Sequence, residues 1–166
     1  TFDQARDHAL ALAEAQRLRF WSGRKNAFPA SGRISPDYMC MDSTIPRKRL
    51  ADILIAIQAM EQRYGLRCCN VFHAGDGNMH PLILYNINDP EESARAEEAG
   101  NDILRLCVDC GGCLTGEHGV GVEKRDLMRH QYSEADLAQQ MRLRAAFDPK
   151  WIMNPSKVFP LEGRTA

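Results

Sequence analysis

The order of strands and helices predicted between residues 37 and 115 constrains the fold of this chain most strongly. An apolar stripe at helical spacing predicts a helix that Gly65 ends, and two apolar runs around the turn Gly75–Asn78 predict a β-hairpin. The predicted elements are, in order, a strand at 37–42, a helix at 50–64, strands at 66–73 and 79–85, a helix at 88–110 and a strand at 113–115. This β-α-β-β-α-β order is that of the ferredoxin-like fold. We therefore expect an α+β domain whose antiparallel sheet carries its helices on one face.

Further helices are expected on both sides of this unit. Apolar residues at helical spacing predict a helix over 3–22, and two more are predicted near 122–130 and over 134–147. Glycine, proline and serine are frequent from Ser22 to Pro36, which predicts a loop. The length of 166 residues fits one domain, so we expect a single domain over the whole chain.

The composition excludes several classes of protein. The formal net charge is −1, from 21 basic and 22 acidic residues, whereas nucleic-acid binding needs a clustered basic surplus. No apolar run approaches the roughly 18 residues that span a bilayer. Acidic residues within the first apolar stretch argue against a secretory signal. Because the sequence begins at Thr1 rather than Met, we expect a processed or excised piece of a longer protein.

The six cysteines are expected to be reduced thiols of a cytoplasmic protein, since a chain of this length can build a core without disulfides. Cys107, Cys110 and Cys113 do repeat the C-x₂-C-x₂-C spacing of iron–sulfur ligation. The fourth cysteine of that pattern is missing, and the first two end a predicted amphipathic helix, where cysteine serves as a small apolar residue. We favour buried thiols and keep an iron–sulfur electron carrier as an alternative.

Two glycine-rich stretches carry three of the five histidines. His73 and His80 bracket the turn of the predicted hairpin, and Glu117 and His118 follow each other between glycines. Two imidazoles and one carboxylate form the open ligand set of a catalytic divalent metal. Taken singly, the turn and each histidine are ordinary structural features, but their concentration in two clusters favours a site. His8 and His130 lie on polar helix faces and are expected to be solvated.

Five stretches of the sequence resemble one known family. They are RFWSGRKNAFPA, ISPDYMCMDSTIPR, FHAGDGNMHPLIL, GEHGVGVEKRDLM and FDPKWIMNPSKVFP. In this order and spacing they are similar to the C-terminal half of the FAD-linked subunit of glycolate oxidase, within the FAD-linked oxidases of the vanillyl-alcohol-oxidase type. The resemblance extends from about Phe20 to Pro160. It implies that 1–166 is a C-terminal cap domain and that a separate N-terminal domain, absent from this chain, holds the FAD.

The resemblance also implies a reaction and the residues that carry it. The implied reaction is the oxidation of a 2-hydroxy acid to the 2-oxo acid by hydride transfer to FAD, whose redox chemistry is its own. The implied roles are a divalent-metal site of zinc or manganese at His73, His80 and Glu117, a catalytic base at His118, a clamp on the substrate carboxylate at Arg24, and a flavin-adjacent position at Asn154.

Two departures from the D-2-hydroxyglutarate branch of the family bear on the substrate. That branch has a lysine at the position of Cys40 and an asparagine at that of Leu82. Both groups would hold a second carboxylate, so their loss favours glycolate or D-lactate. The serine in place of glycine in the NPSK stretch is a minor departure.

The resemblance implies partners as well. These are the FAD-binding domain and other glycolate oxidase subunits, including an iron–sulfur subunit, through which a cytoplasmic protein could associate with the inner face of a membrane. Exposed apolar surface on the predicted helix over 3–20 would favour a homo-oligomer.

Two points stay open from the sequence. The chain contains no phosphate-binding motif for a dinucleotide, so we expect it to be inactive alone, and a ferredoxin-like metal- or small-molecule-binding module without catalysis is the alternative function. In the simplest ferredoxin-like topology, the end of the last strand lies opposite the hairpin turn, which would hold Glu117 away from His73. Either the ligands project from the sheet face, or the strand limits differ by a few residues.

Overall fold

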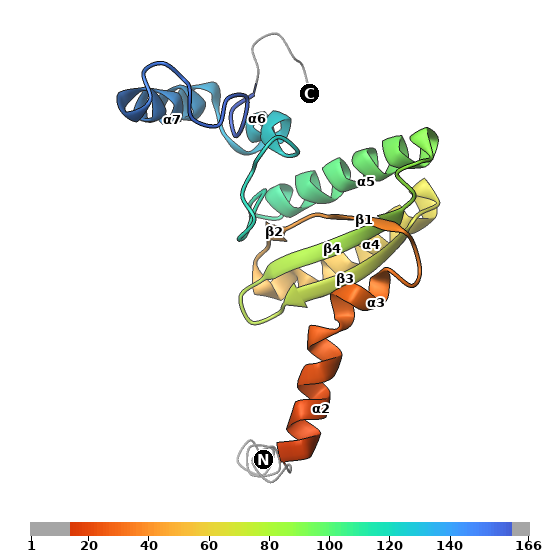
Figure 1. Ribbon diagram of the computed structural model, residues 1–166. Coiled ribbons are helices and arrows are strands. Elements are labelled where there is room, and N and C mark those ends of the chain that lie inside the picture. The colour runs from red at the N-terminus through yellow and green to blue at the C-terminus, as the bar shows by residue number, and fades with distance from the viewer. Residues whose placement is uncertain (1–13, 161–166) are drawn as a thin grey trace.

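The computed structural model describes residues 14–160, without the side chains of Glu14, Ala15 and Arg24. The predicted helix over 3–22 thus lies partly outside the described residues. Its described part belongs to helix α2 (Glu14–Lys25), which points away from the sheet (Figure 1). The exposed apolar side chains on α2 are Leu18, Phe20 and Trp21.

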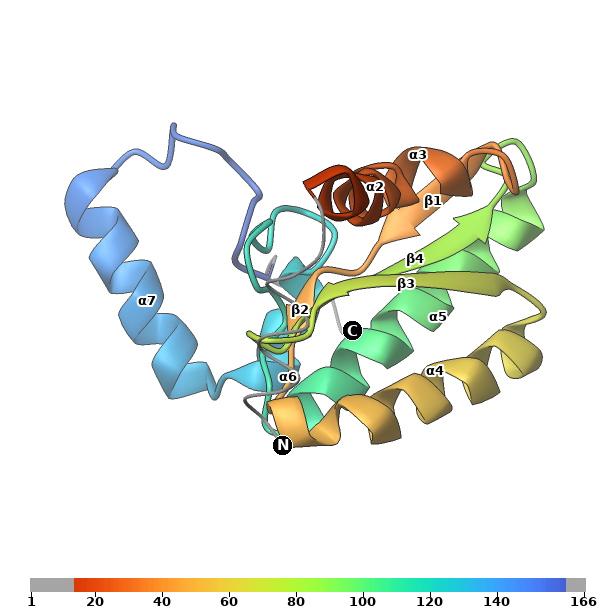
Figure 2. The same cartoon turned by 90° about the horizontal axis from the view of Figure 1, so that it is seen from below.

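The loop predicted from Ser22 to Pro36 is wrong in its first half, because α2 continues to Lys25 and helix α3 (Ala27–Ser31) follows. Pro29 is compatible with α3 since it lies in the first turn, where a backbone N–H has no acceptor within the helix. In Figure 2, α3 lies on the opposite side of the sheet from α4 and α5. The ring of Phe28 on α3 is 6.2 Å from that of His80, so α3 borders the sheet face that carries the histidines.

The sheet is built around strand β4 (Asn78–Tyr85), which pairs antiparallel with every other strand. Strand β3 (Arg67–His73) forms the predicted hairpin with β4 and lies on one side of it. Strands β1 (Asp37–Cys40) and β2 (Ser43–Thr44) share its other side. Thr44 in turn forms an antiparallel bridge with Cys113, so the spatial order is that of a ferredoxin-like sheet.

The last strand, predicted at 113–115, is reduced to this single bridge between Cys113 and Thr44. The physical reason is that the backbone N–H of Leu114 donates to the side chain of Gln131 at 2.7 Å instead of to a neighbouring strand. The N–H groups of the next residues, 116–118, bind the side chain of Asp42. The predicted α+β class and strand order are confirmed, and the prediction of the last strand's extent is wrong.

Helices α4 (Leu50–Tyr64) and α5 (Pro90–Asp109) cover one face of the sheet (Figure 2). Gly65 ends α4 as predicted, with a φ of 64° that favours glycine, and the Asp89 side chain accepts hydrogen bonds at the start of α5. The short helix η1 (Arg47–Arg49) precedes α4. The core between helices and sheet includes Ile53, Ile57, Met79, Ile83, Ala96, Ile103, Leu104 and Cys107.

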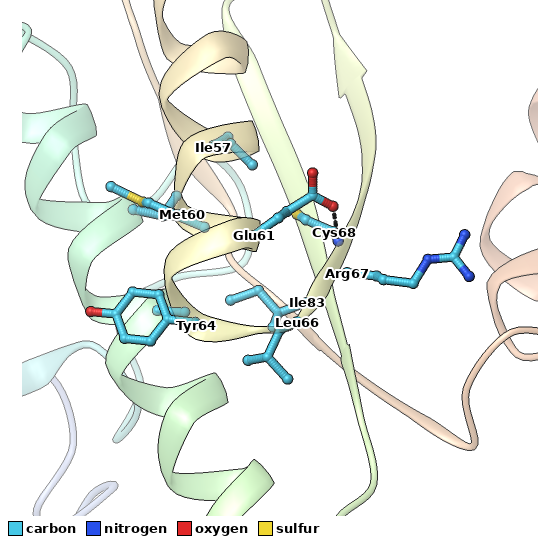
Figure 3. A pocket seen from close by; sticks show the side chains of 10 residues that line it. Ile57, Met60, Glu61, Tyr64, Leu66, Arg67, Cys68 and Ile83 are labelled. Carbon is cyan, nitrogen blue, oxygen red and sulfur yellow. Dashed lines mark hydrogen bonds between the residues drawn. The ribbon is translucent and has the colours of Figure 1, made fainter.

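Polar contacts close the far end of this core, where α4 turns into β3. Figure 3 shows Glu61 of α4 accepting a hydrogen bond from the backbone N–H of Cys68, beside a small apolar gap. Nearby, the Tyr64 hydroxyl donates to Asp102 on α5 at 2.6 Å. These contacts lie on the helix-covered side of the sheet, away from the histidines.

The C-terminal part leaves the sheet. The helix predicted near 122–130 is shorter than expected and consists of η2 (Arg125–Leu127) and α6 (Met128–Gln131). Helix α7 (Glu134–Phe147) matches its prediction, begins at a capping box formed by Ser133 and Asp136, and lies apart from the sheet (Figure 1). No helix within the described residues is long and apolar enough to cross a membrane.

Candidate metal and substrate site

The hairpin brings His73 and His80 to one face of the sheet. His73 pairs with Asn78 and His80 pairs with Val71, so the two imidazoles are diagonal neighbours on that face. Their ring centroids are 5.6 Å apart. The turn requires glycine at Gly77, because its φ is 78° and an added Cβ would lie 2.2 Å from the carbonyl oxygen of Ile45.

Glu117 completes the predicted group of ligands. Its Oε1 atom lies 2.8 Å from Nε2 of His80 and 3.8 Å from Nε2 of His73. The ligand atoms of these three residues all lie within 4.8 Å of one another. The structure therefore brings together the three residues expected to bind a metal, and they project from the sheet face rather than from its ends.

Asp42 explains how Glu117 reaches the histidines. It follows β1, and the register that pairs Cys40 with Leu82 and Ser43 with Met79 places it opposite His80. Its side chain is completely buried. The carboxylate accepts hydrogen bonds from the hydroxyl of Thr115 at 2.7 Å and from the backbone N–H groups of 116, 117 and 118 at 2.9, 3.1 and 2.9 Å.

Sequence reasoning missed Asp42, although an acidic residue inside an apolar strand was visible. The close packing of the loop 115–118 on the hairpin also requires glycine at Gly116, because an added Cβ there would lie 2.3 Å from Oδ1 of Asn78. The loop therefore packs closely enough on the hairpin to hold Glu117 beside the imidazoles.

The charge of Asp42 is compensated within the protein. Lys124, only 3% exposed, donates a hydrogen bond to the backbone carbonyl of Asp42, and its Nζ lies 3.6 Å from the carboxylate. Burial alone would raise the pKa of Asp42, but the hydrogen bonds from Thr115, His118 and Gly116 together with Lys124 lower it to about 2. Burial lowers the pKa of Lys124, and Asp42 opposes that shift.

His80 is the buried centre of the site. Its side chain is 3% exposed, and within the described residues neither of its ring nitrogens has a hydrogen-bond partner, because the approach of Glu117 lacks hydrogen-bond geometry. Buried polar atoms normally have partners. A divalent ion bound at Nε2 would satisfy that nitrogen, and imidazole with carboxylate suits zinc or manganese. His80 also belongs to a second possible ligand group, with Asp42 and His118.

His118 borders both the ligand group and an adjoining pocket. Its ring centroid is 5.0 Å from that of His80, and its Nε2 is 3.9 Å from Glu117. The pocket has a volume of about 280 Å³ and is lined by Cys40, His118, residues 119–124 and Lys157. Burial and the nearby Asp42 raise the pKa of the Cys40 thiol to about 11. An anionic small molecule in this pocket would meet an imidazole and a lysine.

The other expected site residues are placed differently. The backbone of Arg24 lies near the end of α2, and its side chain is outside the described residues. Asn154 follows α7 with a φ of 46°, and its backbone carbonyl accepts a hydrogen bond from Arg144 of α7. Leu82 is completely buried next to His80 in β4. Arg24 and Asn154 thus stay predictions.

The cysteine run does not form a second metal site in the described part of the chain. Cys107 is completely buried and lies 3.4 Å from the Ser43 hydroxyl, whereas Cys113 is exposed at the edge of the sheet. All six cysteines are free thiols, and the possible ligand groups among the described residues contain none of them. The expectation of reduced thiols stays a prediction.

His130 was expected to be solvated. Its side chain is partly exposed, and its Nε2 lies 2.8 Å from a carboxylate oxygen of Asp109, away from the site. His8 lies outside the described residues.

The described residues form a ferredoxin-like α+β domain with a histidine and carboxylate cluster on one sheet face, and comparison with known proteins identifies the family of this domain. The family described as FAD linked oxidases, C-terminal domain, matches residues 3–158. The chain belongs to this family.

Named relatives narrow the comparison. The chain is 56% identical over 162 residues to the glycolate oxidase subunit GlcD of Escherichia coli (strain K12), an alignment that covers 98% of the chain and 32% of that protein. It is 35% identical to GlcD of Bacillus subtilis over 97% of the chain and 33% of the relative. A mitochondrial D-lactate dehydrogenase [cytochrome] of Kluyveromyces lactis is 34% identical, in an alignment that covers 94% of the chain and 26% of that protein. The chain spans about a third of the length of its first two relatives.

Proposed function

We propose that this chain is the substrate- and metal-binding cap of an FAD-dependent 2-hydroxyacid oxidase or dehydrogenase that acts on glycolate or D-lactate. Membership of the FAD linked oxidases and the names of the relatives support this class of reaction. The observation that carries the proposal is the buried His80, whose ring nitrogens have no hydrogen-bond partner among residues 14–160, while the carboxylate of Glu117 lies 2.8 Å away.

His73, His80 and Glu117 would hold the divalent metal, which we propose to be zinc or manganese. When bound, the metal would lower the pKa of the substrate hydroxyl and the flavin would accept the hydride. A buried imidazole and two half-exposed groups suit an ion that is held on one side by protein and open on the other to a small molecule.

His118 is proposed as the base that takes the proton of the substrate hydroxyl at its imidazole nitrogen. Its ring is 48% exposed, borders the pocket and lies beside the ligand group, so it can reach a molecule bound there. Arg24 is proposed to bind the substrate carboxylate, since a guanidinium pairs with a carboxylate through two parallel hydrogen bonds. The short Cys40 in the pocket wall carries no cation for a second carboxylate, which favours a small substrate.

The flavin is proposed to be held mainly by a part of the protein outside this chain, with Asn154 near it. The relatives are about three times as long as this chain, which leaves room for such a part. Partner subunits, including an iron–sulfur subunit, and a cytoplasmic location with association to a membrane through them belong to the same proposal. The exposed Leu18, Phe20 and Trp21 of α2 are available for contacts with a partner or a second copy.

Reconstitution tests the proposed function. The chain is produced together with a matching flavin domain, and dye reduction is measured with glycolate and with D-lactate. We expect reduction that depends on both parts and is lost in the His73→Ala, His80→Ala double variant. If the reconstituted protein binds flavin but oxidises no 2-hydroxy acid, the chain is a metal- or small-molecule-binding module instead. Elemental analysis of the same samples reports whether that module holds a metal.

A further inference from the structure

The loop 115–118 forms an anion-binding turn whose anion comes from the protein itself. Three successive backbone N–H groups, of Gly116, Glu117 and His118, point at Oδ2 of Asp42. Successive N–H groups in a turn form a concavity of this kind, which in other proteins binds phosphate or another external anion. Here a buried carboxylate between β1 and β2 fills it.

We propose that Asp42 is a positioning residue, which fixes the backbone of 116–118 and so directs Glu117 and His118 toward the hairpin histidines. This inference rests on the proposed metal site. Because the three N–H groups point inward at Asp42, the side chains between them must leave the turn on its other side. Glu117 then reaches Nε2 of His80 at 2.8 Å, and the centroid of the His118 ring lies 5.0 Å from that of His80.

The register of the sheet makes this arrangement possible. Asp42 lies opposite His80 in neighbouring strands, and its Oδ1 is 3.6 Å from Nε2 of His80. The carboxylate therefore links the hairpin side of the site to the loop side. Both Asp42 and His80 are almost completely buried, so this distance is held by the packing of the sheet.

A carboxylate suits this position better than an amide. An asparagine could place its single oxygen at the position of Oδ2, but its NH₂ group would then face the N–H of Glu117, which lies 3.3 Å from Oδ1, and the negative charge would be lost. Lys124 supports the negative charge through its contacts with the carbonyl and the carboxylate of Asp42. An unpaired buried carboxylate would otherwise be unfavourable.

A competing role for Asp42 is that of a metal ligand, in the group with His80 and His118. Thr115 separates the two roles. Its hydroxyl donates to Asp42 at 2.7 Å and accepts from the N–H of Gly119 at 2.8 Å, so it organises the turn without belonging to either ligand group. Removing this hydroxyl should weaken metal binding if Asp42 positions the turn, and should leave metal binding unchanged if Asp42 is itself a metal ligand.

The test compares zinc and manganese binding by titration calorimetry in the 166-residue chain and its variants. We expect Asp42→Ala and Asp42→Asn to weaken metal binding by about 10- to 100-fold, the usual effect of groups that orient metal ligands. Thr115→Val should weaken it by less. Sodium formate should restore binding in Asp42→Ala, where it can enter the vacated space, and not in Asp42→Asn, where the space is filled.

The matched control is Asp102→Ala. That carboxylate also accepts a tyrosine hydroxyl, at 2.6 Å, but lies on the helix-covered side of the sheet. It should lower the stability of the chain and leave metal affinity unchanged. Circular dichroism of each variant reports whether it is folded, and Thr115→Val carries the test if both Asp42 variants are unfolded.

Amide hydrogen exchange of residues 116–118 provides a second readout that needs no metal. We expect protection in the parent chain, its loss in Asp42→Ala and its recovery with formate. Unchanged metal affinity in folded Asp42→Ala would overturn the inference and leave the proposed function intact. Weakened metal binding in Asp42→Ala with unchanged binding in Thr115→Val would instead make Asp42 a metal ligand. If the parent chain binds neither metal, the proposed metal site fails, and exchange alone then decides whether Asp42 organises the turn.

Discussion

Replacing His118 by alanine separates catalysis from metal binding. The side chain is 48% exposed and belongs to a loop, so its removal should change the free energy of unfolding by no more than about 0.5 kcal/mol. His73, His80 and Glu117 keep their mutual distances, so the metal content should stay intact. The proton acceptor at the pocket, by contrast, is lost.

The expected magnitude follows from the share of general base catalysis. Such a group contributes about 10²- to 10⁴-fold to the rate, so His118→Ala should lower kcat of the reconstituted enzyme by this factor. At about 1.36 kcal/mol for each factor of ten, the barrier rises by about 2.7 to 5.4 kcal/mol. This is far larger than the expected effect on stability, and the two measurements are therefore easily distinguished.

The assay measures kcat with glycolate and D-lactate, metal content by elemental analysis and thermal stability, all on the same preparations. His130→Ala is the matched control, because this partly exposed histidine pairs with Asp109 away from the site and should change neither kcat nor metal content. Loss of metal together with activity in His118→Ala would refute the reasoning and make His118 a metal ligand, in the group it forms with Asp42 and His80.

Three further predictions address the metal, the substrate clamp and the thiols. Adding zinc or manganese at about 100 times its dissociation constant should stabilise the chain by about 2.7 kcal/mol, which is a rise in Tm of about 5–11 °C, and the double variant His73→Ala, His80→Ala should show no shift in calorimetry. Arg24→Ala in the reconstituted enzyme should raise KM and leave kcat nearly unchanged, because a carboxylate clamp acts equally in ground and transition states; an unchanged KM would contradict that role. Burial raises the pKa of Cys107 to about 11 and that of Cys68 to about 12, so the unfolded chain loses these protons first and stability should fall as pH rises above about 9. Urea unfolding at pH 8 and pH 10 should show this decrease in the free energy of unfolding, and the decrease should be smaller in Cys107→Ala. An equal decrease in both proteins would show that this thiol does not contribute.

The sequence by itself determined the elements whose signals are local. The apolar stripe and Gly65 predicted α4 correctly, and two apolar runs around a glycine turn predicted the β3–β4 hairpin. These signals are reliable because helix periodicity, a left-handed glycine and a tight turn each depend on a few neighbouring residues. Because the hairpin is local, the approach of His73 and His80 was predictable as well.

The residue types already grouped Glu117 with this pair, and the resemblance to a family implied the same ligand set, but neither explained how Glu117 reaches the sheet face. In the structure, Thr115 and Lys124 both bind Asp42, from which they are separated by 73 and 82 residues in the sequence.

 Those contacts join the segment between strands β1 and β2 to the loop that follows Cys113, and no local pattern in either segment shows that the two meet.

Only the tertiary structure decided the role of Asp42 and the short extent of the last strand. The role of an aspartate in an apolar strand follows only from its hydrogen-bond partners. Here these partners are the backbone N–H groups of residues 116–118, and every residue except proline carries such a group. Past the bridge at Cys113, the N–H of Leu114 donates to the Gln131 side chain and those of 116–118 to Asp42, so the predicted strand at 113–115 shrinks to one bridge. Backbone donors carry no sequence signal, and their choice between a strand and a buried carboxylate is made by long-range packing, which is why the structure was needed to find it.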